Sequence, residues 1–321
     1  MIGIFLLGLA AVHATPTSTI ERTGSTIAQV RSFSADTGEQ LWAGYGRAPF
    51  GLLLVGESDE TLLCRDQAPD GFRPAGTDEA TGCARFTRGR SGLPNTLLAA
   101  MPLFGPPSVI VMGTPQSTGR SEAAWVRTVL HEHFHQWQAS LPEYYSRTAA
   151  LDLSGGDQTG MWMLNYPFPY EQTAVIKAEA DASAALLEAV EARRTPDFYS
   201  KFDAYLAQRR RFEQAAGRRN WRYAELQLWQ EGVARWTEIE LGKTFPDPEV
   251  RKSAEDLERK TLAELRSPDL AGRKREFVYA YGAAEAMLME TCGAKWRRAY
   301  PDQLQLGALL QLARSTCGQR D

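Results

Sequence analysis

Apolar residues recur at helical spacing through most of the chain after residue 121. In the first of these segments, SEAAWVRTVLHEHFHQWQAS at 121–140, most apolar side chains stand three or four residues apart, as on one face of an α-helix. Ser121 is a suitable N-cap for this helix, and Pro142 ends it. The same spacing predicts helices at 171–194, 198–216, 221–241, 249–265, 275–291 and 302–315.

Before residue 121 the pattern changes to short apolar runs separated by clusters of Gly, Pro and Asp. These runs predict strands at GLLLVG (51–56), TLLC (61–64) and SVIVMG (108–113). The long Gly- and aromatic-containing loop at 151–171 is expected to line a functional site. The sequence therefore predicts an α+β fold with a strand-rich part over 15–120 and a mostly helical part over 121–321.

The first fourteen residues, MIGIFLLGLAAVHA, are apolar and end in Val12-His13-Ala14, which is similar to a signal-peptidase site. We expect residues 1–14 to be a secretory signal peptide, although they contain no Lys or Arg; a buried N-terminal strand is the alternative. The segment is too short to span a bilayer, and no stable membrane span is expected elsewhere. These features predict an exported protein, periplasmic or secreted.

The four cysteines agree with export, because disulfides persist in oxidising compartments. Four cysteines allow three pairings, and the sequence does not choose between them. The local pairs Cys64–Cys83 and Cys292–Cys317 are the simplest.

The formal net charge of −3 and the isoelectric point near 5.9 give no electrostatic reason to expect a nucleic-acid partner. The exception is the basic run RRRFEQAAGRR at 209–219. It lies in a polar, helix-like stretch and is interpreted as a solvated helix face.

Residues 131–135, His-Glu-His-Phe-His, carry the motif H-E-x-x-H within the first predicted helix. Residues four apart lie on one face of a helix, so His131 and His135 can bind one metal ion, and Zn²⁺ suits imidazole nitrogen. Glu132 then lies beside the open coordination position, where its carboxylate can accept a proton from the attacking water. His133 points to another side of the helix and is interpreted as a bystander.

A catalytic zinc site needs three protein ligands and one open position. The only histidine outside the motif is His13, in the predicted signal peptide, so the third ligand has to be Asp or Glu or, less readily, Cys. Glu231 is the best candidate, because it lies in LWQEGVARWTE (228–238), whose apolar residues predict a buried helix. A glutamate on the buried side of a helix is costly unless it is paired or metal-bound.

Taken together, HEHFH and the later QEGVARW resemble the gluzincin metallopeptidases, whose second helix carries the third ligand. The similarity is closest to the aminopeptidase-like branch of peptidase clan MA, where that helix opens with Asn-Glu-Gly; here the positions are Gln230, Glu231 and Gly232. A third segment, YAYGAAEAMLMETCGAKW at 279–296, is similar to the same branch's Tyr-x-x-Gly stretch. The resemblance implies a zincin-like catalytic region with one zinc ion per chain, held by His131, His135 and Glu231.

In that branch the tyrosine donates a hydrogen bond to the tetrahedral intermediate, a role that falls on Tyr279 here, with Tyr281 as the alternative donor. A rival third ligand is Glu179, because KAEADASAA resembles the Glu-Ala-Asp helix of another gluzincin branch. That branch places its ligand where this chain has Lys177.

The chain also departs from the aminopeptidase-like pattern. His135 and Glu231 are 231 − 135 = 96 residues apart, so a helical insertion has to separate them. The Gly-Ala-Met-Glu-Asn motif that binds a substrate's free amine is absent, so aminopeptidase activity is not implied.

The sequence thus favours an exported zinc metallopeptidase that acts on a peptide or protein, with Glu132 as general base and Tyr279 as oxyanion donor. The strand at 108–113 is expected to form the upper edge of the cleft and to pair with an extended substrate. Two alternatives remain open: a non-catalytic metal-binding or interaction protein on a zincin scaffold, and a zinc hydrolase of a non-peptide substrate.

Overall fold

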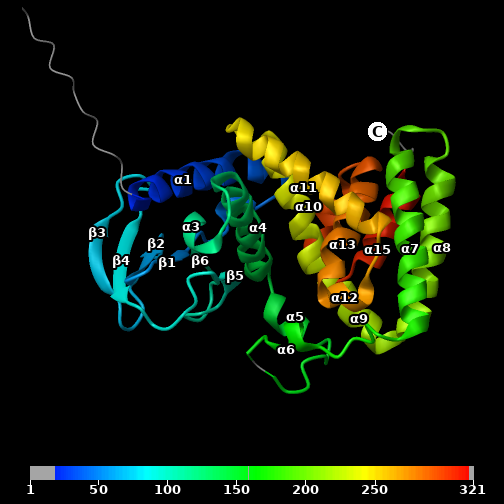
Figure 1. Ribbon diagram of the computed structural model, residues 1–321, viewed down its shortest axis with the longest axis horizontal. Helices are drawn as coiled ribbons and strands as arrows, with labels where there is room; N and C mark the ends of the chain where they lie inside the picture. The colour runs from blue at the N-terminus through cyan, green and yellow to red at the C-terminus, as the bar shows by residue number, and fades with distance from the viewer. Residues whose placement is uncertain (1–18, 158, 318–321) are drawn as a thin grey trace, which may run out of the picture.

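The computed structural model describes residues 19–157 and 159–317, so the predicted signal peptide at 1–14 lies outside the described residues. The strands gather in one part of the molecule, the later helices form the other, and α4 (Glu122–Ser140) runs between them (Figure 1). The fold is therefore α+β, as the sequence predicts. Among the described residues, no helix combines the length and the apolar character that crossing a membrane requires.

The first described element is a helix, although the sequence analysis expects strands from residue 15 onward. Helix α1 (Thr19–Phe33) continues through a π-helical turn, η1 (Ser34–Gly38), into α2 (Glu39–Leu41). Its buried apolar side chains, Ile27, Val30 and Phe33, are three residues apart and share one helix face. This spacing indicates a helix, and the expectation of strands is wrong for 19–41.

The six strands of the described residues fall between residues 52 and 113 and form one mixed sheet of order β3-β4-β2-β1-β6-β5. They are β1 (Leu52–Val55), β2 (Asp59–Leu63), β3 (Arg73–Thr77), β4 (Ala84–Gly89), β5 (Leu98–Met101) and β6 (Val109–Gly113). β1 and β6 are parallel, and the other pairs are antiparallel. Successive side chains of β6 alternate between the two faces: Ile110 and Met112 join the main core with the helices, and Val109 and Val111 join a smaller core on the other face. Both faces of the central strands are therefore buried.

The position of β6 corrects one expectation about the cleft. The predicted run 108–113 forms a strand, but β6 lies between β1 and β5 and is fully buried. β5 is the strand at that edge of the sheet, beside α4. Its sequence Leu-Ala-Ala-Met is short and only half-buried, so it lacks the apolar run by which β6 is recognised.

The helical part follows the predicted helices closely. The long helices are α7 (Thr173–Glu191), α8 (Phe198–Ala216), α9 (Arg218–Gln227), α10 (Val233–Thr244), α11 (Pro248–Arg266), α13 (Phe277–Thr291) and α15 (Leu306–Thr316). Shorter helices are α3 (Pro115–Thr118), α5 (Tyr144–Ala149), α6 (Trp162–Asn165), α12 (Leu270–Arg273) and α14 (Lys295–Ala299). The 3₁₀ turns of the described residues are η2 (Tyr45–Arg47), η3 (Ala192–Arg194), η5 (Lys274–Glu276) and η6 (Tyr300–Asp302).

One predicted helix, 221–241, is divided. α9 and α10 are joined by a π-helical turn, η4 (Leu228–Gly232), which contains Glu231. Helix α4 packs against β5 and β6 with one side and against α10 and α11 with the other. This arrangement brings Glu231 beside the HEHFH motif although 96 residues separate Glu231 from His135.

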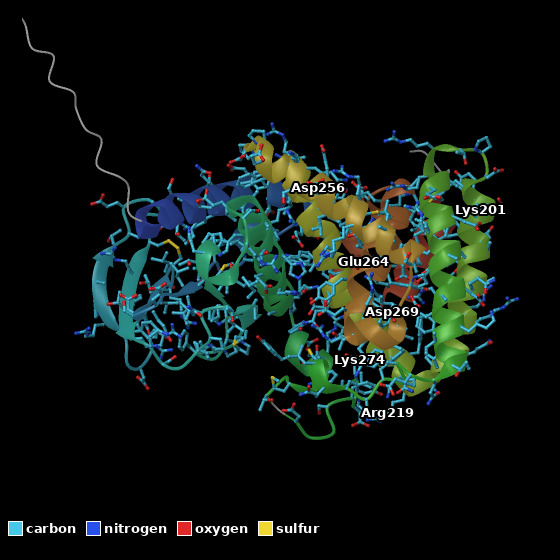
Figure 2. The ribbon with its side chains drawn as sticks, in the orientation of Figure 1. Lys201, Arg219, Asp256, Glu264, Asp269 and Lys274 are labelled. Carbon is cyan, nitrogen blue, oxygen red and sulfur yellow. A yellow bond between two sulfur atoms is a disulfide. The ribbon has the colours of Figure 1, made fainter. Side chains whose placement is uncertain are left out.

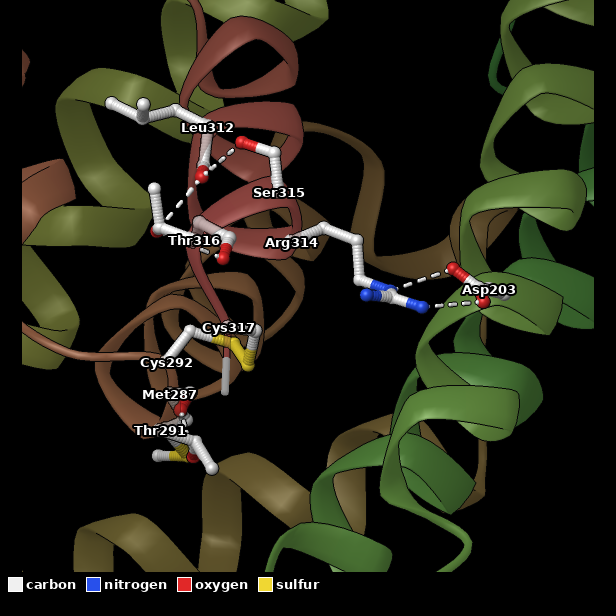
Figure 3. Close-up of a disulfide and its surroundings, with 10 residues drawn as sticks. Asp203, Met287, Thr291, Cys292, Leu312, Arg314, Ser315, Thr316 and Cys317 are labelled. Atoms are coloured by element: carbon white, nitrogen blue, oxygen red, sulfur yellow. Dashed lines mark hydrogen bonds and ion pairs between the residues drawn. A yellow bond between two sulfur atoms is a disulfide. The ribbon is translucent and has the colours of Figure 1, made fainter. Parts of the chain in front are cut away.

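Two disulfides connect the local cysteine pairs. Cys64–Cys83 lies in the sheet part and Cys292–Cys317 in the helical part, with Cα–Cα distances of 4.8 and 4.4 Å. Figure 3 shows the second disulfide at the end of α15, where Arg314 of the same helix forms a two-fold ion pair with Asp203 of α8. The C-terminal helix is thus attached to the body by a covalent link and by a salt bridge.

Candidate metal centre

Helix α4 begins where its sequence indicates and holds the H-E-x-x-H motif in the interior. The Ser121 side chain caps the helix, with its Oγ accepting from the N–H of Ala124 at 3.2 Å. Most residues of the helix from Trp125 to Gln138 are buried, on its polar as well as its apolar sides. Buried polar side chains require partners, and in this helix the partners define a site.

His131, His135 and Glu231 come together as one group that could hold a metal ion. The two Nε2 atoms are 3.1 Å apart, and Oε2 of Glu231 lies 3.5 Å from that of His131 and 3.2 Å from that of His135. Ligands of a tetrahedral zinc ion at about 2.0–2.1 Å are about 3.3 Å apart, so the triangle has the size that zinc requires. Two imidazole nitrogens and a carboxylate oxygen are together a donor set that can bind a divalent metal ion.

The guanidinium group of Arg275 holds Glu231 in place from the side away from the histidines. Its Oε1 faces Nη1 of Arg275 at 3.3 Å, which leaves Oε2 directed at the two histidines. Burial raises the pKa of Glu231, but His135, His131 and Arg275 outweigh it and hold the pKa well below its usual range. The carboxylate is therefore ionised, as a metal ligand must be.

The outer ring nitrogens of both histidines face oxygen atoms. Nδ1 of His135 bonds Oε1 of Gln138 at 2.7 Å, and Nδ1 of His131 lies 3.4 Å from Oε2 of Glu238. Burial lowers the pKa of His131, but Glu231 and Glu238 raise it to about 9. The surroundings of His131 thus stabilise positive charge, which a divalent cation would also supply.

Gln138 connects the two halves of the site. While its Oε1 bonds His135, its Nε2 donates to the carbonyl of Gln230 at 3.1 Å and to the hydroxyl of Tyr300 at 2.6 Å. Tyr300 in turn donates to the carbonyl of Trp229 at 2.6 Å. These bonds fix the π-helical turn that carries Glu231 against α4, which is the role of outer partners in metal sites.

Glu132 stands outside the ligand triangle. Its Oε2 accepts a hydrogen bond from the backbone N–H of Ala100 in β5 at 2.7 Å, and its side chain is buried. The bond ties α4 to the edge strand of the sheet and orients the carboxylate. A carboxylate fixed one residue from a metal ligand can act as a general base.

Tyr279 lies beside the same group of residues. Its ring centroid is 6.0 Å from that of His131, and its hydroxyl accepts from Nη2 of Arg275 at 3.3 Å. Burial and the negative charges of Glu231 and Glu132 raise the pKa of Tyr279, despite the opposing charge of Arg275. The hydroxyl therefore keeps its proton and can donate a hydrogen bond.

The rival residues lie elsewhere. Glu179 accepts from the hydroxyl of Ser183 at 2.6 Å within α7 and is not a member of the His–Glu group. Tyr281 is fully buried with its ring 6.2 Å from that of Tyr205, away from the histidines. His133 bonds Gln136 at 3.0 Å on another side of α4.

Three residues that support the centre were not foreseen from the sequence: Gln138, Glu238 and Arg275. Glu238 follows Glu231 by seven residues, about two helical turns, and this spacing could have identified it. Gln138 follows His135 by three residues, and this spacing on one helix could have identified it as well. Arg275 carries no comparable signal, because it reaches the site through tertiary packing. The long loop 151–171 packs against α9: the ring of Tyr166 stacks on that of Tyr223, whose hydroxyl donates to the carbonyl of Met163.

No protein-family model matches the chain, and neither a curated protein nor a solved structure shows significant similarity to it. The comparisons therefore add no activity to the geometry described above. The case for a function depends on the residues of the centre.

Proposed function

We propose that the chain is an exported zinc-dependent hydrolase of the gluzincin type, with a zincin-like catalytic region that cleaves peptide bonds. The observation that carries the proposal is the combination of a closed His131–His135–Glu231 triangle with a separate, oriented carboxylate, Glu132. Metal ligation alone has no need of Glu132. Hydrolysis needs both a metal site and a base beside it.

Zinc fits the site better than the hard cations do. The group offers two imidazole nitrogens and one carboxylate, whereas Mg²⁺ and Ca²⁺ prefer oxygen ligands only. When bound, zinc lowers the pKa of a coordinated water and polarises a substrate carbonyl. The residues of this chain then have to orient the substrate and move the proton.

Glu132 is the base in this mechanism. Its carboxylate is buried, and the N–H of Ala100 fixes one oxygen, so the other oxygen is available for the attacking water. Glu132 accepts the proton of that water and then delivers it to the leaving amine. A positioned general base contributes about 10²–10⁴-fold to the rate of such a reaction.

Tyr279 is proposed to stabilise the oxyanion that develops on the scissile carbonyl. Its protonated hydroxyl lies beside the His131 ring and is backed by Arg275. A neutral donor next to a cation can strengthen its hydrogen bond as negative charge forms on the substrate.

The edge strand β5 offers a surface for an extended peptide. Its other edge pairs with β6, and the N–H of Ala100 points away from β6 toward Glu132. Because backbone groups of alternate residues point the same way, Leu98 presents its own N–H and C=O along the same edge. A substrate strand that pairs there would lie against the catalytic carboxylate.

The two disulfides support an oxidising compartment for this protein. Both pairs of cysteines are bonded, and disulfides persist mainly outside the cytosol. The protein is accordingly proposed to act in an oxidising compartment after export.

The deciding experiment is peptide hydrolysis by the zinc-loaded protein, with casein and a peptide library as substrates. We expect cleavage that a chelator abolishes and that added zinc restores. The matched variant is Glu132→Gln, which keeps the shape of the side chain and removes its basicity; it should retain one equivalent of zinc and lose about 10²–10⁴-fold in turnover. Zinc-loaded Glu132→Gln protein that cleaves at the parent rate would refute the mechanism. Zinc binding without cleavage of any peptide would favour the non-catalytic or non-peptide alternatives.

A further inference from the structure

The basic run at 209–219 is not a uniformly solvated helix face. With residues of α9 and α15 it surrounds a cavity of about 470 Å³, a volume typical of small-molecule sites. We call it the arginine cavity, defined by its charged lining residues Arg209, Arg210, Glu213, Arg218, Arg222 and Glu225. Its lining residues include the end of α8 and the start of α9. The junction of these two helices lies at one end of the helical part (Figure 1).

The charges of the arginine cavity do not balance. Four arginines and two glutamates line it, which gives 4 − 2 = +2. Arg209 is paired with Glu225 at 2.7 Å and with Glu285 of α13 at 2.6 Å. In the part of the chain that the structure describes, neither Arg210, Arg218 nor Arg222 forms an ion pair. The excess positive charge therefore belongs to these three side chains.

Two buried donors of the lining residues lack hydrogen-bond partners among the described residues. They are Nη2 of Arg209, whose side chain is only 8% exposed, and Nε of Arg222. A buried donor without an acceptor costs free energy, so a ligand that supplies acceptor oxygens would be stabilising here.

Two helices begin at the cavity. α9 starts at Arg218 and α15 at Leu306, and no side chain caps either helix at its N-cap residue. The first N–H groups of a helix and its dipole attract anions. At α15 the chain supplies the anion itself, because Oε2 of Glu225 accepts from the N–H of Gly307 at 3.0 Å. Among the residues that the structure describes, no carboxylate bonds the start of α9, which is flanked by Arg218 and Arg222.

We infer that the arginine cavity binds a phosphomonoester. Such a group carries about −1.5 to −2 charges at neutral pH, which matches the excess of +2, and it presents three acceptor oxygens. Planar guanidinium groups bind phosphate oxygens through paired hydrogen bonds. The phosphomonoester can come from a free phosphate compound or from the headgroup of a lipid. This site is separate from the metal centre and does not depend on the proposed hydrolase activity.

The test compares Arg210→Gln/Arg218→Gln with Arg219→Gln. Arg210 and Arg218 are exposed, so their replacement should leave the fold intact. Arg219 is an exposed neighbour that does not line the cavity; it already donates to the carbonyl of Asp152 at 2.8 Å, and Figure 2 shows it at the same end of the molecule. Zinc content and melting temperature without ligand are measured first and should be equal in all three proteins.

Binding is measured at constant ionic strength with two probes: calorimetric titration with inorganic phosphate, and sedimentation with phosphatidylcholine vesicles that contain or lack phosphatidic acid. We expect the parent and Arg219→Gln to bind equally, and the double variant to bind at least about tenfold more weakly. Loss of phosphate binding without a difference on the vesicles identifies a free phosphomonoester as the ligand, and loss of binding to the vesicles that contain phosphatidic acid identifies the lipid headgroup. Equal binding by all three proteins, or no binding of either probe to the parent, would overturn the inference.

Discussion

At the scale of single residues, Glu231 stands between two histidines and an arginine, because its two oxygens have different partners. Oε2 faces both motif histidines and Oε1 faces Arg275. Removing this carboxylate would leave the histidine pair and Arg275 without an anion between them. Glu179, by contrast, accepts a hydrogen bond from the hydroxyl of Ser183 in its own helix.

Glu231→Ala is accordingly expected to lower zinc affinity by more than about 100-fold, since even the loss of an outer partner of a metal ligand costs up to that much. Glu179→Ala should bind zinc as the parent does and serves as the matched control. Competition with a chromogenic chelator measures both affinities, and far-ultraviolet circular dichroism checks the fold. A loss of zinc in Glu179→Ala but not in Glu231→Ala would move the site to α7.

A second prediction concerns two tyrosines on one helix. Tyr279→Phe should keep its zinc and lose about 10²–10³-fold in kcat, because it removes only the hydroxyl that we propose to bond the developing oxyanion. Tyr281→Phe is the control, since its hydroxyl is buried without a hydrogen-bond partner among the described residues and its ring packs near Tyr205. Steady-state kinetics on one cleaved peptide compare the two; equal losses would exclude a specific role for Tyr279.

The residues of the centre divide into those that sequence reasoning finds and those that it does not. His131, His135 and Glu132 follow from a four-residue spacing on one helix, a purely local property. Arg275 lies 44 residues after Glu231 and Gln138 lies 92 residues before Gln230. Such pairs are brought together by packing, which a single sequence does not encode in any local pattern.

At the scale of elements, the π-helical turn η4 crosses α13 at a point where both elements have a glycine, Gly232 in η4 and Gly282 in α13. A Cβ on Gly282 would lie 2.8 Å from Cα of Gly232 and 2.8 Å from the carbonyl oxygen of Leu228. Both obstacles are backbone atoms, so they cannot move aside as a flexible side chain would. The two glycines therefore set the distance between α13, which carries Tyr279, and the turn that carries Glu231.

Gly282→Ala should push these elements apart. We expect a loss of about 1–3 kcal/mol in the free energy of unfolding, as for other overpacked interiors, together with weaker zinc binding. Gly89→Ala is the control, because a Cβ there meets nothing within 4 Å. Urea unfolding and zinc competition measure the two effects; a Gly282→Ala protein that equals the parent in both would show that the crossing can relax.

The elements that the sequence predicts best are those whose burial repeats with a strong period. The predicted helix 198–216 coincides with α8, and 121–140 differs from α4 by one residue. β3 has hardly any buried side chains, so no apolar pattern marks it. The apolar pattern does not mark the π-helical turn inside 221–241 either, because one additional residue in a turn leaves the run of apolar positions in place.

At the scale of the whole molecule, each of the two parts has its own covalent link. Cys64–Cys83 closes the loop around β3 in the sheet part, and Cys292–Cys317 connects α13 to the end of α15. The linked residues are 19 and 25 positions apart, and loops of this size gain about 3 kcal/mol from a disulfide in the chain-entropy account. Neither disulfide connects the sheet part to the helical part.

The protein purified from an oxidising compartment is therefore expected to contain no free thiols and to melt at a lower temperature in reductant. Intact mass after alkylation without reduction checks the first statement, and thermal unfolding with and without reductant checks the second. Cys292→Ala/Cys317→Ala should lose about 3 kcal/mol while the sheet part keeps its own link. Four alkylated cysteines in that protein would contradict the prediction.

The π-helical turn η4 also determines how α9 is rotated relative to α10 about the helix axis. An α-helix advances by about 100° per residue, so one residue more or less in 228–232 changes the phase between everything before the turn and everything after it. α9, with the arginine cavity at its start, lies on one side, and Glu238, which faces His131, lies on the other. Deleting a single residue from the turn would leave both helices intact but rotate one against the other by about a quarter of a revolution. The orientation of the arginine cavity relative to the metal centre therefore depends on η4, which sets the rotation of α9 relative to α10 about their common axis.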